Sequence, residues 1–373
     1  MDSKRRKVIE GLAKDVNKKF GEGALVFGVD LAKVGLRVIP TGSVLFDKIT
    51  GVGGLPRGRI IEISGPESSG KTSLCCAFVA KCQEEGLVCA YLDPEPLEDE
   101  YAERLGVNLD ELIRSKSKER ITAERWLQMA RWLIKVADVD VIVVDSLPAM
   151  VPQIEFEDSK KERTLENKSV AALAALLSYA LRIINTEMNQ KQGDKPVIVV
   201  TNQVRTKIGI MYGNPEDTPG GRALKHYASL RFWVRKIENI TETGRDFDFK
   251  KQEYKEMEIP VGFRMRIRNK KSKVSVEQPP QDISIYLDGG FNIMEELFVA
   301  HLIDEKVIKH RGRFYFADEV DENGKPTKTY YESQIKKELY KRVCDENFDT
   351  GEDDSESEMS EVSDETDEDN SSD

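Results

Sequence analysis

The feature that most constrains the fold is a set of strands that are apolar on both faces. Two of them, Val141–Asp145 and Val197–Thr201, consist almost wholly of Val and Ile. Both faces of such a strand are covered when a parallel sheet packs between helices. Strand and helix patterns alternate from about residue 36, which predicts a doubly wound α/β domain with ligands bound at the carboxyl ends of its strands. Further strands are expected over Arg59–Ser64 and Leu87–Asp93, and helices from Lys71, over Ala123–Val136 and over Ser169–Met188.

The net charge of −11 is unevenly distributed along the chain. Asp345–Asp373 contains 15 acidic residues and no Lys or Arg, whereas the other 344 residues hold 56 basic and 52 acidic side chains, a net of +4. The acidic end has too few apolar residues to form a core, so a disordered tail is expected. A basic body with an acidic tail suggests work on nucleic acids.

Patterns outside the α/β region predict further parts. Residues 4–20 form an amphipathic helix whose apolar stripe needs a partner, and a neighbouring subunit would supply one. After residue 260 the pattern indicates antiparallel strands and then a smaller helical region. The expected organisation is an N-terminal oligomerisation helix and linker over 1–35, the core over 36–289, a small α+β C-terminal domain over 290–344 and the tail over 345–373.

Location and cysteine usage fit an intracellular protein. No apolar run approaches the ~20 residues of a membrane-spanning helix, and the basic start Met1–Lys7 is not followed by an apolar signal core. A cytoplasmic protein is therefore expected. The five Cys are an odd number without metal-ligand spacing, so we expect buried free thiols. His226, His301 and His310 are too scattered to form a metal site.

The segment Gly65–Thr72 reads G-x-x-x-x-G-K-T between a predicted strand and a predicted helix. That is the context which a phosphate-binding loop requires, because backbone N–H groups and the helix N-terminus then bind phosphate oxygens. Lys71 would reach the β- and γ-phosphates of ATP, and the Thr72 hydroxyl would ligate Mg²⁺. The expected nucleotide-binding residues are Gly65, Pro66, Glu67, Ser68, Ser69, Gly70, Lys71 and Thr72 of this segment and the following Ser73.

Acidic residues follow two of the predicted strands. Asp145 comes about 70 residues after the phosphate loop and is the candidate carboxylate for Mg²⁺ or its water. Glu95 is the candidate base for the water that attacks ATP. A solvated acidic loop is the alternative, since chemistry alone does not choose between Glu95 and its neighbours Asp93, Glu98, Asp99 and Glu100.

A long loop follows the strand that ends at Thr201. Loops of more than ~15 residues inside compact domains are usually functional or disordered. Cations that pair with phosphates and side chains that stack on bases would bind single-stranded DNA. The alternative is a surface loop whose apolar tip packs on the core; the charged segment Glu155–Lys168 also reads as a loop. The candidate DNA-contacting residues are Arg205, Lys207, Met211 and Tyr212.

Residues 263–273 contain six Lys or Arg and no acid. In a strand, alternate cations would point one way at intervals of ~6.7 Å, while Met265 and Ile267 point into a core. Such a row suits phosphates, either of DNA or of a neighbouring subunit's ATP. The alternative is a solvent-exposed edge strand whose charges prevent it from pairing with another chain. The cations of the row are Arg264, Arg266, Arg268 and Lys270.

Several stretches together resemble the bacterial RecA recombinase family, from the N-terminal helix to about residue 344. The resemblance implies a RecA-like P-loop ATPase that uses ATP and Mg²⁺. It further implies a helical filament on single-stranded DNA that pairs with homologous double-stranded DNA and exchanges strands in repair. Single-strand-binding and loader proteins are implied as further partners. The stretches are Pro40–Ser43, Gly53–Ile60, Gly65–Thr72, Val141–Ser146 and Lys207–Glu216.

The resemblance also implies roles for individual residues. Glu95 is similar to the glutamate that activates water, and Gln203 is similar to the residue that senses the γ-phosphate. Tyr101 is similar to the tyrosine that stacks on adenine. Arg268 and Lys270 resemble paired cations that reach the neighbouring subunit's ATP. The positions that match DNA contacts are Arg182, Arg205, Lys207, Gly220 and Gly221.

The chain also departs from the family pattern. The segment before Tyr101 is one residue shorter than usual, His226 stands where the family usually has Phe, and Asp246–Pro260 resembles an insertion. A bacteriophage member of the family would fit this divergence. Two other functions suit the same residues: a ring-forming motor such as a helicase, and an ATP-dependent DNA-binding regulator without strand exchange.

Overall fold

The computed structural model describes residues 3–21, 36–115, 121–136, 138–157, 172–191, 193–206, 216–248, 253–322 and 324–349. The chain divides into two compact units, Met1–Glu296 and Leu297–Asp373, and each is described by itself. The first unit ends slightly later than the core boundary expected at residue 289. It holds the expected phosphate loop and the basic strand.

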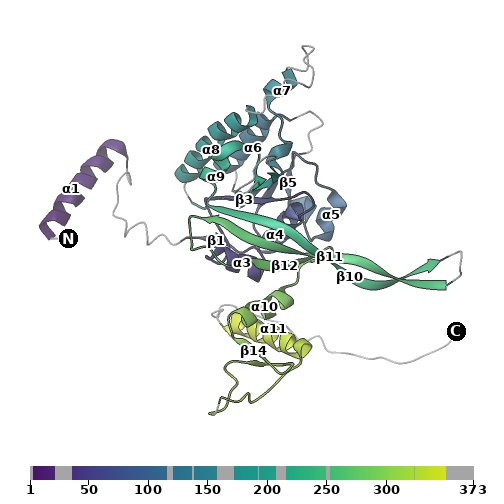
Figure 1. Ribbon diagram of the computed structural model, residues 1–373. Helices are drawn as coiled ribbons and strands as arrows, with labels where there is room; N and C mark the ends of the chain where they lie inside the picture. The colour runs from purple at the N-terminus through teal and green to yellow at the C-terminus, as the bar shows by residue number, and fades with distance from the viewer. Residues whose placement is uncertain are drawn as a thin grey trace, which may run out of the picture. The chain divides into compact units, whose positions relative to one another are not determined.

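A sheet of nine strands, counted over the described residues, forms the centre of the first unit, in the order β13-β12-β11-β10-β3-β7-β6-β4-β5 (Figure 1). Neighbours from β10 to β5 are parallel, and those from β10 to β13 are antiparallel. The α/β fold with a parallel sheet is thus confirmed. Its strands are β3 (Ile60–Gly65), β4 (Cys89–Leu92), β5 (Ile113–Arg114), β6 (Val141–Val144), β7 (Val197–Gln203), β10 (Leu230–Asp248), β11 (Glu253–Ser272), β12 (Gln281–Tyr286) and β13 (Gly290–Phe291).

Helices cover both faces of the parallel strands. On one face, α6 (Ala123–Val136), α8 (Ala172–Gln190) and α9 (Gly221–Tyr227) pack on alternate strand residues. The intervening residues point to the other face, where α4 (Lys71–Glu84) contacts β3, β4, β6 and β7. Burial on both faces is what the apolar strands predicted. The residues of the first face include Ile60, Ala90, Ile142 and Ile198, and those of the second include Ile61, Tyr91, Val143 and Val199.

Shorter elements complete the first unit. Gln153–Glu157 is helical, so the start of the charged segment that we expected to be a loop forms α7 instead; residues 158–171 lie outside the described residues. The remaining elements are β1 (Val38–Ile39), α3 (Val44–Thr50), β2 (Leu55–Pro56), α5 (Asp99–Arg104), the 3-10 helices Leu109–Glu111 and Leu147–Ala149, β8 (Arg205–Thr206) and β9 (Glu216–Asp217).

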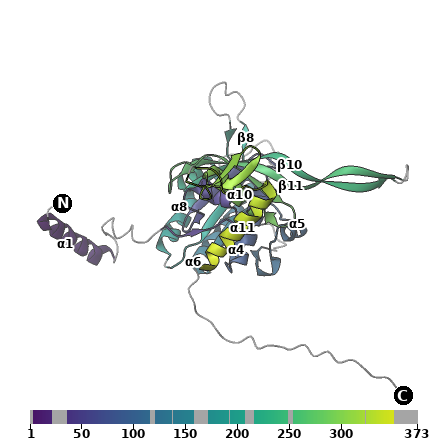
Figure 2. The ribbon, with the colours of Figure 1, turned by 90° about the horizontal axis from the view of Figure 1, so that it is seen from below.

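Strands β10 and β11 continue beyond the sheet as a two-stranded ribbon. β10 pairs with β3 only over Leu230–Trp233, and β11 pairs with β12 only over Gly262–Ile267. Farther out the two strands pair with each other, up to Asp248 and Glu253, and both views show them projecting from the unit (Figure 1 and Figure 2). The residues that resembled an insertion, 246–260, belong largely to this ribbon, so β11 begins before the expected strand region.

The expected N-terminal helix is confirmed as α1 (Ser3–Phe20). Its apolar stripe is exposed: the exposed fraction is 63% for Val8, 60% for Leu12 and 70% for Phe20. Docking of this stripe on another subunit remains a prediction. The expected linker over residues 22–35 lies outside the described residues.

The second unit contains β14 (Val307–His310), β15 (Arg313–Phe316) and α11 (Glu332–Asp349), while α10 (Ile293–Ile303) spans the boundary between the units. β14 and β15 form an antiparallel hairpin. Phe298 packs edge-on against Phe314 with ring centroids 5.2 Å apart. The helix α11 continues to Asp349, so the first residues of the expected disordered tail are helical. The rest of the tail, residues 350–373, lies outside the described residues.

The cysteines are free, as predicted, and Cys75, Cys76, Cys82 and Cys89 are buried. Among the described residues, no group of three or more His, Cys, Asp and Glu side chains is placed to hold a metal ion by themselves. Within the same residues, no helix is long and apolar enough to cross a membrane.

Candidate nucleotide-binding site

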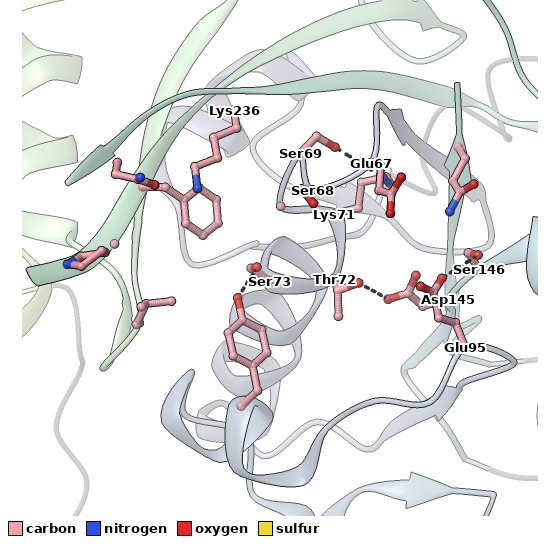
Figure 3. Close-up of a pocket in the computed structure, with 18 residues that line it drawn as sticks. Glu67, Ser68, Ser69, Lys71, Thr72, Ser73, Glu95, Asp145, Ser146 and Lys236 are labelled. Atoms are coloured by element: carbon pink, nitrogen blue, oxygen red, sulfur yellow. Dashed lines mark hydrogen bonds between the residues drawn. The ribbon is translucent and has the colours of Figure 1, made fainter. Parts of the chain in front are cut away.

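The phosphate loop joins the buried strand β3 to the helix α4 and forms the floor of a pocket of about 390 Å³ (Figure 3). Two of its glycines are required by close packing. A Cβ on Gly65 would lie 2.3 Å from the carbonyl oxygen of Val234, and one on Gly70 would lie 2.5 Å from Phe263. Gly70 also has a φ of +87°, a conformation that favours glycine. Val234 of β10 and Phe263 of β11 therefore pack directly against the loop.

The Lys71 side chain turns back toward the start of the phosphate loop. Its Nζ donates to the carbonyl oxygen of Pro66 at 2.7 Å and of Gly65 at 3.3 Å. Burial lowers the pKa of the Lys71 ammonium, while the nearby Asp145 and Glu95 carboxylates act in the opposite direction. Phosphate oxygens would offer this cation stronger acceptors than neutral carbonyls do.

Asp145 follows β6 and is 5% exposed. Its Oδ2 accepts hydrogen bonds from Thr72 Oγ1 at 2.8 Å and from Tyr91 Oη at 2.7 Å, and its Oδ1 accepts one from Thr201 Oγ1. Three hydroxyls thus fix the carboxylate beside Thr72. Carboxylate and hydroxyl oxygens suit Mg²⁺, and the residues present fit that ion. Tyr91 and Thr201 were missed from the sequence, although each is a polar group within a predicted apolar strand.

The structure distinguishes Glu95 from the acidic residues around it. Asp93 forms an ion pair with Arg114 at 2.9 Å, and the same guanidinium pairs with Asp99. Glu98 and Glu100 do not line the pocket, whereas Glu95 does. The Ser146 hydroxyl donates to Glu95 Oε2 at 3.3 Å. Of the five acidic residues that the sequence left open in this loop, Glu95 alone lines the pocket.

Tyr101 and Gln203 also line the pocket. The Tyr101 hydroxyl lies 2.6 Å from Ser73 Oγ, so the ring stands against the first turn of α4. Gln203 ends β7 opposite Gly65 of β3. The preceding Asn202 is buried and donates to Glu62 at 3.0 Å and to the Pro219 carbonyl at 3.2 Å. This amide ties the start of the expected DNA loop to its end.

The opposite wall of the pocket comes from the base of the β10–β11 ribbon and was not predicted. Figure 3 shows Lys236 across the phosphate loop from Asp145 and Glu95. Lys236 also lies 5.1 Å from the ring centroid of Phe263. Nothing in the local pattern marks these residues, because they approach the loop only through sheet pairing. The residues of this wall are Lys236, Asn239, Pro260, Gly262 and Phe263 of these two strands, together with Leu287, which follows β12.

Among the described residues, none of the candidate DNA contacts lines this pocket. Arg205 begins β8, whereas Lys207, Met211 and Tyr212 lie outside the described residues. Arg182 is exposed on α8, with its guanidinium 5.6 Å from the Tyr179 ring centroid.

Gly220 and Gly221 precede and begin α9, with φ values of +91° and +73°. A Cβ on Gly220 would lie 2.8 Å from Leu177, and one on Gly221 would lie 3.2 Å from Ala174. Close packing of α9 on α8 therefore accounts for both glycines.

The cations of β11 separate into two kinds. Met265 and Ile267 are buried, as expected. Arg264 pairs with Glu238 at 2.9 Å, and Arg266 pairs with Asp282 at 2.6 Å. Arg268 and Lys270 instead lie over the Trp233 ring, and neither lines the nucleotide pocket of its own chain.

Residues 7–292 match the RecA N-terminal domain family. The chain is 39% identical to Protein RecA of Thermus thermophilus over 298 residues, which cover 80% of this chain and 81% of the relative. It is 38% identical to Protein RecA of Deinococcus radiodurans over 349 residues, which cover 92% and 89% of the two chains. For Protein RecA of Lactiplantibacillus pentosus the identity is 37% over 316 residues, with coverage of 84% and 77%.

These matches extend across the phosphate loop, the parallel sheet and the strands behind it. They support the expected ATP hydrolase rather than a binding module of another class. This chain belongs to the RecA family of DNA-dependent ATPases, which carry out strand exchange in recombination and repair.

Proposed function

We propose that the pocket binds ATP with Mg²⁺ and that Glu95 promotes hydrolysis in support of strand exchange. The observation that carries this proposal is that one cavity is lined by Lys71, Thr72, Asp145, Glu95 and Gln203. These residues come from four separate places in the sequence and meet at the carboxyl ends of neighbouring parallel strands.

Each residue has a distinct task. Lys71 binds the β- and γ-phosphates, while Thr72 and Asp145 hold Mg²⁺, which neutralises the charge that develops on the phosphates. Glu95 accepts a proton from the attacking water. Tyr101 faces adenine. Gln203 stands where the pocket meets the DNA loop, so it can report the γ-phosphate to that loop.

The DNA and the neighbouring subunit complete the assembly. The segment 203–221 contacts single-stranded DNA through Arg205, Lys207, Met211 and Tyr212, with Arg182 as a further contact. The bound single-stranded DNA is paired with a homologous double-stranded DNA. Subunits associate head-to-tail into a helical filament, because such an interface need not close. The helix α1 docks on the next subunit, and Arg268 and Lys270 reach the neighbouring ATP.

Two glutamine substitutions test the proposed base. Glu95→Gln removes the proton acceptor but keeps a hydrogen-bonding side chain, so turnover with single-stranded DNA should fall by ~10²-fold or more. Binding of a slowly hydrolysed ATP analogue should persist. Glu98→Gln is the matched control, since Glu98 is exposed and does not line the pocket. Loss of turnover in Glu98→Gln with normal turnover in Glu95→Gln would contradict the assignment.

Filament growth is tested separately from hydrolysis. Negative-stain microscopy with single-stranded DNA and a slowly hydrolysed ATP analogue should show helical filaments. Closed rings would instead favour a motor of the helicase type. A strand-exchange assay with homologous duplex should show product only when ATP or the analogue is present.

A further inference from the structure

We propose that Trp233 is a positioning residue that holds Arg268 and Lys270 together for the phosphates of the neighbouring subunit's nucleotide. This inference rests on the proposed role of the two cations across the interface. It adds a third residue to that role, one on the partner strand β10.

The contact geometry places both cations on one ring. Trp233 stands directly opposite Arg268 in the β10–β11 pairing. The Arg268 guanidinium carbon lies 5.8 Å from the ring centroid, and Lys270 Nζ lies 5.7 Å from it. Both distances fall within the ~6 Å over which a cation is attracted to an aromatic face. One indole therefore organises two positive charges.

A β-bulge brings Lys270 into this arrangement. Phe232 of β10 pairs with Asn269 of β11, whereas the preceding residue, Arg231, pairs with Lys271. Lys270 is therefore the extra residue and has no partner on β10. Such bulges re-aim side chains and are frequent beside active sites. The bulge is fixed at Asn269, a residue that lies between the two cations in the sequence.

Asn269 is 2% exposed and anchors the bulge from the core side. Its Nδ2 donates to the Ile49 carbonyl oxygen at 3.4 Å, and its Oδ1 accepts from the Lys271 backbone N–H at 3.1 Å. The backbone under the cations is therefore held by polar contacts. Of the hydrogen bonds, ion pairs and ring contacts among the described residues, the two side chains form only the contacts with the indole.

The two preceding cations of the same strand differ from Arg268 and Lys270 in being restrained by carboxylates. Arg264 and Arg266 are neutralised by Glu238 and Asp282. Within the described part of the chain, Arg268 and Lys270 form no ion pair. An aromatic face attracts a cation without cancelling its charge, so the pair keeps its full charge for a phosphate while losing rotamer freedom. A carboxylate in place of Trp233 would restrain the cations but would also compete with the phosphate.

Kinetics of Trp233→Leu test the positioning role, with Trp233→Phe as the matched variant that keeps an aromatic face. In the full-length protein with single-stranded DNA, Trp233→Leu should lower kcat about three- to tenfold with little change in KM for ATP. Trp233→Phe should retain most of the kcat. Equal kcat in Trp233→Leu and the unaltered protein, or equal losses in both variants, would overturn the proposal.

A mixing experiment separates positioning from a folding defect. In a mixture of Trp233→Leu and Lys71→Ala subunits, some interfaces combine an intact pocket with an intact Trp233, Arg268 and Lys270. Activity should then exceed the sum of the separate variants. Activity equal to that sum would overturn the role of Trp233 across the interface. The proposed ATPase function would still stand if Glu95→Gln lowers turnover as expected.

Fluorescence reports the contact itself. The chain has three Trp, so Trp126→Phe with Trp132→Phe leaves Trp233 as the emitter. Assembly on single-stranded DNA with a slowly hydrolysed ATP analogue should change its emission as the cations engage phosphate. Adding Arg268→Ala and Lys270→Ala should abolish that change. Emission that is constant on assembly, or that changes equally without the two cations, would contradict the proposal.

Discussion

At the scale of single residues, the chemistry depends on side chains that are held by their neighbours before nucleotide binds. Asp145 receives three hydroxyl hydrogen bonds, and Lys71 is held by the carbonyls of its own loop. Lys71 and Thr72 were predictable because the motif that identifies them lies within one short segment of the sequence. Tyr91 and Thr201 were not, because their role arises only when β4, β6 and β7 lie side by side.

Lys71→Ala should abolish ATP hydrolysis with little loss of stability. Its ammonium contacts loop carbonyls rather than the apolar core, and burial that lowers its pKa disfavours the charged form. Turnover and a circular-dichroism melt measure the two effects. Retained turnover, or a melting temperature shifted by tens of degrees, would count against the assignment.

At the scale of elements, α3 and α10 are linked by a buried carboxylate. Glu296 accepts hydrogen bonds from the Ser43 hydroxyl at 2.7 Å and from the Leu45 backbone N–H at 3.3 Å. Burial raises the pKa of Glu296 from 4.5 to about 7. Burial likewise raises the pKa of the nearby Asp47 to about 7. The first turn of α3 is therefore linked to protonation of this pair.

The Glu296 link predicts a pH-dependent stability. A carboxyl whose pKa is higher in the folded state binds more protons when folded, so stability falls as pH rises from about 4.5 towards about 7. Glu296→Gln should remove part of this loss, on the order of 2 kcal/mol at pH 8. Thermal melts at pH 5 and pH 8 measure it, with the exposed Glu277→Gln as control. Parallel pH dependence in Glu296→Gln and the unaltered protein would contradict the linkage.

The elements themselves were largely predictable where apolar periodicity is strong. The helix over Ala123–Val136 has the expected bounds. β6 lies within the expected strand, and β7 begins at the expected residue and continues to Gln203. The β10–β11 ribbon was not predictable, because its outer part is polar and pairs only with itself. The pocket wall around Lys236 and Phe263 could not be found from the sequence either, because these residues approach the phosphate loop only through sheet pairing.

At the scale of the whole molecule, the charge is divided between a body of net +4 and an acidic end, and we expect the acidic end to compete with DNA for the basic body. Because α11 continues to Asp349, the truncation that tests the tail should begin after that residue and leave the helix intact. Residues 350–373 carry 12 acidic residues and no Lys or Arg.

Removing residues 350–373 should strengthen binding to single-stranded DNA at low Mg²⁺. The acidic residues of this segment would compete with DNA phosphates for the basic side chains of the body, and both salt and Mg²⁺ weaken that competition. Titrations of full-length and truncated protein at low and high Mg²⁺ should show a gap in affinity that narrows as Mg²⁺ rises. Equal affinities at low Mg²⁺ would mean that the tail is a solubility segment.

We propose that neighbouring subunits complete each other's ATP site. Lys71→Ala removes the phosphate cation of the pocket, and Arg268→Ala removes a cation that does not line the pocket of its own chain. The most direct test is the ATPase rate of a mixture of these two variants on single-stranded DNA. Mixed interfaces that join the Arg268→Ala pocket to an intact Arg268 should give activity well above the sum of the separate variants. Activity no greater than that sum would contradict the account.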